Sequence, residues 1–390
     1  MDSDTLLLFF RHRLWKLGRP GSSSPFAALS FTLVEMLVAI TVLSVLLVLA
    51  SQVITRTSSV WMYSNYKMTQ GRDARVAFSS LVARLGEATV DQYYGYTNYV
   101  SGTAALPGNY LRRSELRFAS GLATNLIPTT TVVNGVGMTN LVTDATFFVA
   151  PLGIVTNTTL YAHLPSLLNV CGYYVQWSNI DSERPSPPLP TGNGIYRFRL
   201  MQFVQPSESM SVYSQTIPFS ASNTNGNYPA YTFVTGTSWQ NTALSGSPSG
   251  VHPLANNVVA LLLLPSSSTT NSSGSLAPGY LYSTESATAP ANTTALTSVN
   301  RTPPVMRVVM YTIDEKSALH LPQSATMPNL YVSTSGTTLF TDSSKLYPNT
   351  SSGDIGDIGR FEQTLTANKI TFRRYDAAVE LPRQPWNTQN

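Results

Sequence analysis

The stretch Ser30–Ala50, "SFTLVEMLVAITVLSVLLVLA", most constrains what this chain can fold into, because its one charged side chain is Glu35. About 20 residues of helix span about 30 Å, the thickness of the apolar core of a bilayer. The positive-inside rule places the preceding end in the cytoplasm, because four basic side chains stand there: Arg11, Arg13, Lys16 and Arg19. We therefore expect one membrane-spanning helix, with the bulk of the chain beyond the inner membrane.

Three interpretations of this segment compete. A cleaved secretory signal has a shorter apolar region, about 7 to 15 residues, although Val48-Leu49-Ala50 before Ser51 fits a small-residue cleavage site. An uncleaved signal anchor fits the length. Neither interpretation explains Glu35, because a carboxylate inside an apolar span costs about 2.5 to 3.5 kcal/mol on insertion and needs a partner.

The sequence "FTLVEMLVAITVLSVLL" resembles the N-terminal segment of type IV prepilins and type II secretion pseudopilins. The resemblance implies that a prepilin peptidase cuts between Ser30 and Phe31 and then methylates the new amino terminus on Phe31. It also implies a partner for Glu35, the cationic amine of Phe31 in a neighbouring subunit, since an ion pair in a low dielectric satisfies both charges. The family usually has Gly before the cut, where this chain has Ser30, and its leader is usually shorter than residues 1–30.

The helix is expected to continue beyond the membrane, because no proline occurs between Pro25 and Pro107. Apolar residues at spacing i, i+3, i+4, i+7 predict a helix face that packs on a globular domain. This stripe consists of Phe78, Leu81, Val82 and Leu85. Gly86 is expected to end the helix. The stretch Gly71–Tyr94 also resembles the corresponding helix end of minor pseudopilins of the J type. The aromatic "DQYYGY" and the size resemble large pilin-like proteins of the Verru_Chthon cassette.

Past Asp91 the pattern changes to β-strands, rich in β-branched and aromatic residues and bounded by Gly, Pro and Asn. Asn256–Pro265, "NNVVALLLLP", is continuously apolar and predicts a central strand buried on both faces. Six further strands are predicted at 115–120, 145–153, 172–178, 194–204, 305–313 and 370–381, and short helices at 314–321 and 359–369. Pro/Ser/Thr/Asn-rich segments at 183–194 and 266–303 are expected to be loops.

These observations predict an α+β fold, in which a long N-terminal transmembrane helix packs on a β-rich, antiparallel-sheet globular domain of pilin-like layout. The expected organisation is a basic leader at 1–30, a transmembrane or filament-core helix segment at 31–54, a periplasmic amphipathic continuation at 55–90, and an exported β-rich domain at 91–390. Charged residues make up only 11% of the chain, and such an uncharged polar composition suits exported, surface-facing β-proteins. Partly disordered loops are the alternative explanation of that composition.

Sequence motifs for catalysis were not found. There is no Gly-rich phosphate loop, nucleophile elbow, HExxH or paired Cys motif, and the single cysteine, Cys171, fits a buried small hydrophobe. Asp354 and Asp357 in the Gly-rich "SSGDIGDIGR" are a candidate calcium site, although their spacing is not that of an EF-hand and an ordinary turn is the alternative. The net charge of +4 is dispersed, which argues against a nucleic-acid partner.

The expected function is therefore structural. The chain would be a single-pass inner-membrane subunit that a prepilin peptidase processes, without a cofactor unless calcium binds. It would assemble with other pilin-like or pseudopilin subunits into a type II secretion pseudopilus or a type IV pilus-like filament, its C-terminal domain lying in the periplasm or on the extracellular filament. The alternative from another class is a membrane-anchored surface or adhesive protein that binds a glycan or another cell and forms no filament.

Overall fold

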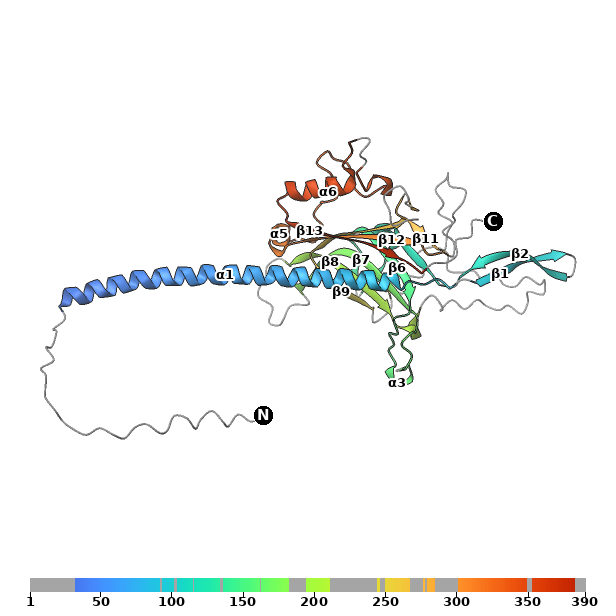
Figure 1. Cartoon of the computed structure of the whole chain (residues 1–390), viewed down its shortest axis with the longest axis horizontal. Helices are drawn as coiled ribbons and strands as arrows, with labels where there is room; N and C mark the ends of the chain where they lie inside the picture. Colours follow the sequence, from blue (N-terminus) through green and yellow to red (C-terminus); the bar gives the residue numbers. More distant parts are fainter. Residues whose placement is uncertain are drawn as a thin grey trace, which may run out of the picture. The chain divides into compact units, whose positions relative to one another are not determined.

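The structure is a computed structural model (Figure 1) that describes residues 32–91, 93–101, 104–114, 116–133, 136–161, 163–181, 194–210, 244–245, 250–266, 276–277, 279–284, 301–348 and 353–382. The chain divides into two compact units, Met1–Met62 and Tyr63–Asn390. The predicted leader 1–30, most of the loop 183–194 and much of the segment 266–303 lie outside the described residues.

The first element is α1, Leu33–Gly86, a helix of 54 residues. It ends at the predicted Gly86. Within the second unit, Leu81 and Leu85 are fully buried, and Phe78 and Val82 are partly buried against the same core. The predicted apolar stripe is therefore confirmed as the packing face of this part of the helix.

A six-stranded antiparallel sheet forms the centre of the second unit, in the order β11-β3-β6-β7-β8-β9. Its strands are β3 Phe118–Leu122, β6 Leu141–Ala150, β7 Asn169–Asn179, β8 Tyr196–Gln205, β9 Val251–Asn256 and β11 Tyr282–Ser283. Successive side chains of a strand point to opposite faces. Tyr173 and Phe148 accordingly join one buried cluster, whereas Tyr174 and Phe147 join the other. This sheet is therefore covered on both faces.

A three-stranded antiparallel sheet follows, in the order β10-β12-β13, with β10 Val258–Ser266, β12 Val305–Ile313 and β13 Phe372–Glu380. Every residue of β10 is buried, as predicted for this apolar segment. Its predicted central position is wrong, because within the described residues β10 pairs with β12 alone and stands at the edge of its sheet. Side chains and one backbone N–H from outside this sheet bond its outer side.

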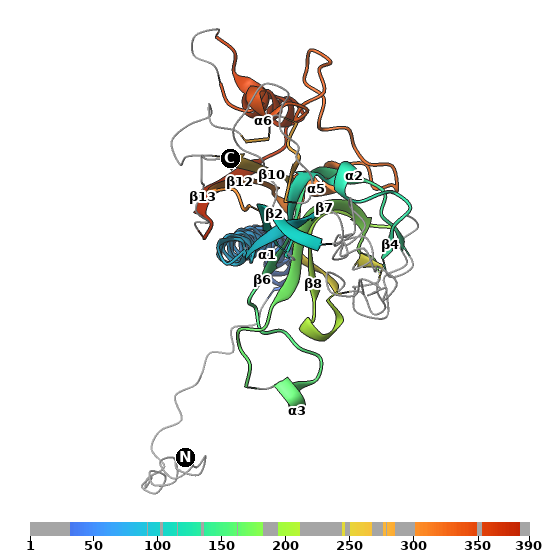
Figure 2. The same ribbon diagram turned by 90° about the vertical axis from the view of Figure 1, so that its right-hand side faces the viewer.

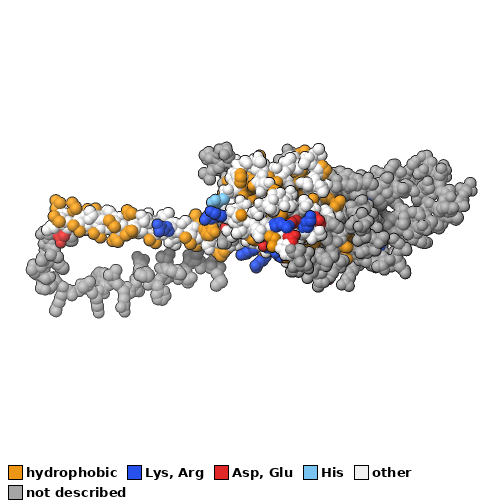
Figure 3. Space-filling model, turned by 90° about the horizontal axis from the view of Figure 1, so that it is seen from above, with side chains coloured by type: hydrophobic (Ala, Val, Ile, Leu, Met, Phe, Trp, Pro, Cys, Tyr) orange, Lys and Arg blue, Asp and Glu red, His pale blue; other side chains and the backbone are white. Residues whose placement is uncertain are grey.

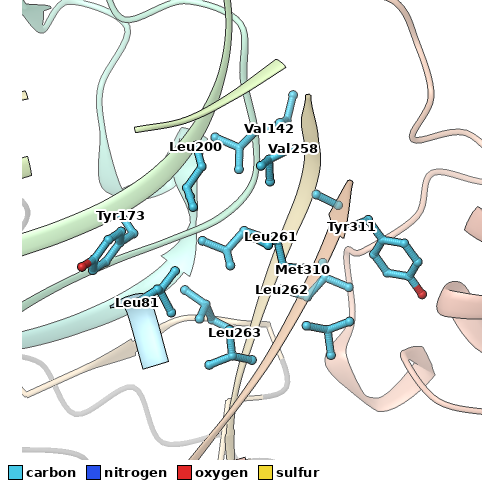
Figure 4. Packing of buried hydrophobic residues seen from close by; sticks show 14 of the residues in the cluster. Leu81, Val142, Tyr173, Leu200, Val258, Leu261, Leu262, Leu263, Met310 and Tyr311 are labelled. Atoms are coloured by element: carbon cyan, nitrogen blue, oxygen red, sulfur yellow. The ribbon is translucent and has the colours of Figure 1, made fainter. Parts of the chain in front are cut away.

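The main core lies between the two sheets and the end of α1. Leu81 of α1, Tyr173 of β7 and Leu263 of β10 belong to one buried cluster there (Figure 4). α6, Gly356–Ala367, covers the other face of the three-stranded sheet (Figures 1 and 2), where the rings of Phe361 and Tyr311 meet edge to face at 5.3 Å. Both α6 and α5, Glu315–His320, lie where helices were predicted.

The remaining elements are small or paired only locally. β1 Tyr93–Ser101 and β2 Ala104–Arg113 form an antiparallel hairpin that the sequence did not predict, and within the described residues these strands pair only with each other. The others are α2 Ala123–Leu126, α3 Thr158–Tyr161, β4 Val132–Val133, β5 Val136–Gly137 and two 3-10 turns at Ser207–Ser209 and Ser343–Lys345. The fold is thus α+β, with a long N-terminal apolar helix and antiparallel sheets, as the sequence predicted.

Candidate functional site

The candidate site is the first turn of α1. Ser30 and Phe31, the predicted cleavage and methylation positions, lie outside the described residues, so the described part of the site begins at Thr32. The backbone N–H and the hydroxyl of Thr32 both donate to Glu35 Oε2 at 3.2 Å, and the Glu35 N–H donates to Thr32 Oγ1 at 3.2 Å. This reciprocal pair is a capping box, which satisfies two of the N–H groups that a helix start leaves free.

The capping box gives Glu35 a partner within its own chain, which the sequence reasoning missed. The signal was present, because "TLVE" at Thr32–Glu35 is a Thr-x-x-Glu pattern that leads into an apolar run. A carboxylate near a helix N-terminus is also favoured by the positive end of the helix dipole. Glu35 therefore has a local structural role in addition to the intersubunit role that the prepilin resemblance implies.

The surface of α1 around Glu35 is apolar. Leu33–Asn65 is long and apolar enough to cross a membrane. Its most apolar stretch has a mean hydropathy of 2.7, and none of that stretch is buried. Hydrophobic side chains cover most of this length of helix in Figure 3. Glu35 shares one face with Val38, Ala39, Val42 and Leu46, so its carboxylate stands at the end of a purely apolar strip.

Hydroxyl groups within this segment are satisfied by the helix itself. Thr41 Oγ1 donates to the Val38 carbonyl at 2.8 Å, and Ser44 Oγ donates to the Ile40 carbonyl at 2.7 Å. Backbone and hydroxyl groups must be paired internally where no water reaches them, as in the hydrocarbon region of a bilayer. These two hydroxyl groups thus meet this requirement without help from another element.

The candidate calcium carboxylates bind an arginine. Arg360 donates from Nη2 to Asp354 Oδ1 at 2.7 Å and from Nη1 to Asp357 Oδ1 at 3.2 Å, and Asp357 Oδ2 accepts the Phe340 N–H at 3.0 Å. No group of three or more His, Cys, Asp or Glu side chains with a metal-binding arrangement occurs among the described residues. The pair is therefore explained by its ion pairs with Arg360 at the start of α6, and calcium binding stays an untested prediction.

Cys171 lies under the end of α1. Its side chain is fully buried, and burial raises the pKa of its thiol above the ordinary value. A nucleophilic cysteine needs a lowered pKa and access to substrate. The interpretation of Cys171 as a small buried hydrophobe therefore agrees with its surroundings.

No protein-family model matches the chain, and no curated protein or solved structure is significantly similar to it. The layout of an N-terminal apolar helix followed by a β-sheet domain is compatible with that of a pilin-like protein. The features that bear on function are therefore Glu35 and the helix that carries it.

Proposed function

We propose that this chain is a pilin-like or pseudopilin structural subunit. It inserts in the inner membrane through the apolar part of α1, is processed by a prepilin peptidase, and assembles with like subunits into a type II secretion pseudopilus or type IV pilus-like filament. The observation that supports the proposal most is Glu35, a carboxylate in the first turn of an apolar helix whose side chains are exposed as far as the described residues extend. We infer a structural rather than a catalytic role.

The physical argument concerns charge and apolar surface together. The donors that Thr32 gives to Glu35 are neutral, so they stabilise the carboxylate without cancelling its charge. The amine of a neighbour's Phe31 cancels the charge, and a buried ion pair with its hydrogen bonds satisfied is far less costly than either charge alone. Packing the exposed apolar helices side by side in a filament core brings the two groups together. The ion pair then sets the axial register between subunits.

The capping box makes a sharp test available, because glutamine serves at its third position as well as glutamate does. Glu35→Gln retains the acceptor for Thr32 and removes the charge, whereas Thr32→Val removes the donor hydroxyl and retains the charge. Glu35→Val removes both the acceptor and the charge. The abundance of each variant in the membrane fraction is compared with its yield of cross-linked or sheared oligomer.

We expect all three variants to insert, with Glu35→Val inserting as well as wild type or better, because a cost of a few kcal/mol is removed. Glu35→Gln and Glu35→Val should both fail to assemble, because a buried unpaired amine costs about 3 to 5 kcal/mol. Thr32→Val should assemble. If Glu35→Gln gave a normal oligomer yield and Thr32→Val gave a lower one, the role of Glu35 in assembly would be that of a helix cap alone. Normal oligomer yield from Glu35→Val would remove the main physical support for the filament, and the absence of oligomer even in wild type would favour the anchored surface protein.

A further inference from the structure

The outer edge of β10 is closed by four groups from three different places in the chain. The Leu261 N–H donates to Thr143 Oγ1 at 3.0 Å, and the Leu263 N–H donates to Asp144 Oδ2 at 2.7 Å. On either side, the Val259 carbonyl accepts the Tyr331 hydroxyl at 2.6 Å, and the Pro265 carbonyl accepts the Leu276 N–H at 2.9 Å. We call these four bonds the edge seal. It takes the place of a neighbouring strand, because an unpaired buried edge would leave these backbone groups unsatisfied.

A distortion of β6 delivers two members of the edge seal. The register between β6 and β7 shifts between Val142 and Thr146. Within this bulge Thr143 has φ 52°, a left-handed backbone that a β-branched residue rarely adopts. The strain persists where the surrounding structure imposes it. Here it turns the Thr143 and Asp144 side chains of the six-stranded sheet onto the edge of the three-stranded sheet.

Asp144 is an unusual member of such a seal. Its side chain is fully buried, Oδ2 accepts the Leu263 N–H, and the other oxygen, Oδ1, is buried with no hydrogen-bond partner. Among the described residues no cationic side chain forms an ion pair with it. The titratable group that faces it is Tyr280, whose buried hydroxyl also has no partner, and Asp342, Asp357 and Tyr347 act on Tyr280 in turn.

Burial of an unpaired carboxylate in apolar surroundings favours its neutral form. Desolvation raises the pKa of Asp144 to about 8, against a smaller opposing contribution from the Leu263 N–H. The neutral acid can still accept the Leu263 N–H on its carbonyl oxygen. The ionised form would leave a full negative charge buried, with the Leu263 N–H as its one hydrogen-bond donor among the described residues. The same geometry therefore suits the protonated seal and penalises the ionised one.

We propose that Asp144 is a proton-binding latch between the two sheets, which closes the edge of β10 in its protonated form and makes folding of the globular domain take up one proton. The carboxylate of the unfolded chain binds a proton from solvent and becomes a carboxylic acid in the folded domain; no other bond changes. The inference is independent of filament assembly, because every group involved belongs to the second unit.

The sign of the pH dependence follows from proton linkage. In a folded state with a raised carboxyl pKa, the native protein holds one proton more than the unfolded chain between the unfolded and folded pKa values. The folding equilibrium constant therefore falls about tenfold for each unit by which pH rises in that window, roughly from pH 4 to pH 8, and then levels off. Asp144 thus contributes most to the stability of the domain at acid pH and least under alkaline conditions.

The test compares the full chain in detergent micelles with two variants that break different halves of the edge seal. Asp144→Asn is nearly isosteric, keeps an acceptor for the Leu263 N–H and cannot ionise. Thr143→Val loses the bond to the Leu261 N–H but keeps Asp144. Denaturant unfolding is followed by the fluorescence of buried Trp177 at several values between about pH 5 and about pH 8.

Relative to Asp144→Asn, the wild-type folding constant should fall about tenfold per pH unit across this range. Thr143→Val should be less stable than wild type by the same factor at every pH, because its bond carries no proton. Parallel pH profiles for wild type and Asp144→Asn would overturn the latch and leave Asp144 a plain hydrogen-bond acceptor.

An infrared measurement on wild type keeps the proposal testable if a variant fails to fold. A carbonyl band of a protonated carboxyl group should persist at about pH 6, well above the ordinary Asp pKa, and disappear as pH passes about 8. Absence of that band at pH 6 in folded protein would also overturn the latch.

Discussion

Arg197 and Glu315 join the six-stranded sheet to α5: the guanidinium donates from Nη2 to Glu315 Oε1 at 2.7 Å, although 118 residues separate them. The Arg197 side chain is only 3% exposed. Glu315 Oε2 also accepts the Asn257 amide at 2.6 Å, and Arg197 donates further to the Tyr196 carbonyl. Glu315 thus neutralises a buried cation and ties the turn before β10 to the same point.

Glu315→Ala should lower the free energy of unfolding by about 2 to 3 kcal/mol, because it leaves a buried guanidinium without its anionic acceptor. Denaturant unfolding of the full chain in micelles measures the change. Lys345→Ala serves as the control: its pair with Asp342 spans 4.0 Å with the lysine 62% exposed, and an exposed pair of this kind is worth no more than about 1 kcal/mol. Equal losses from both variants would contradict the role given to Glu315.

The mature chain should begin at Phe31 with a methylated amine. The expectation rests on the "FTLVE" sequence after Ser30. Mass spectrometry of the N-terminal peptide from native membranes measures it, and finding Met1 or Ser51 at the terminus would exclude it. Ser30→Gly should speed the processing and Ser30→Leu should stop it. Indifference to both changes would mean that no prepilin peptidase acts on this chain.

The loop from Ile154 to Tyr161 should loosen at acid pH. The exposed Glu208 carboxylate accepts the Asn157 N–H at 2.9 Å and the Thr156 N–H at 3.0 Å, and these donors, first that of Asn157, hold the pKa of Glu208 below its ordinary value. A depressed folded pKa means that the stabilisation is complete above the unfolded pKa and is lost as pH falls through the folded value.

Amide hydrogen exchange in residues 154–161, corrected for its intrinsic pH dependence, should therefore report more frequent opening of the loop below about pH 4 than at about pH 6. Glu208→Gln should exchange at a corrected rate that no longer depends on pH, because its amide cannot be protonated in this range. A wild-type loop whose corrected exchange stays constant down to acid pH would contradict the prediction.

Calcium should leave the thermal midpoint of the wild-type chain unchanged, because the Arg360 guanidinium already bonds Asp354 and Asp357. The midpoint is measured with calcium and with a chelator. A calcium-dependent rise that Asp354→Asn abolishes would establish the site after all. Arg360→Met gives a further comparison, since it frees both carboxylates and should lower the midpoint through loss of the ion pairs.

The elements that the sequence predicted well are those with a strong local pattern. The strand at 305–313, the helix end at Gly86 and the stripe containing Leu81 and Leu85 follow from periodicity, which depends on neighbours along the chain. The first turn of α1 belongs here too, because Thr32 and Glu35 are three residues apart and their pattern was readable. The β1–β2 hairpin was not predicted, because its mixed Tyr, Gly and Asn composition lacks a clear alternation of apolar and polar residues.

Only the tertiary structure decided which strand edges meet which side chains. The apolar sequence of β10 is enough to predict that the strand is buried. Its position at the edge of the three-stranded sheet depends on Thr143 and Asp144, which precede it by more than 100 residues. Likewise the turn geometry at the start of α6 brings Arg360 to Asp354 and Asp357. Sequence patterns fix the period and polarity of each element, whereas the partner of a buried polar atom is set by packing between elements distant in sequence.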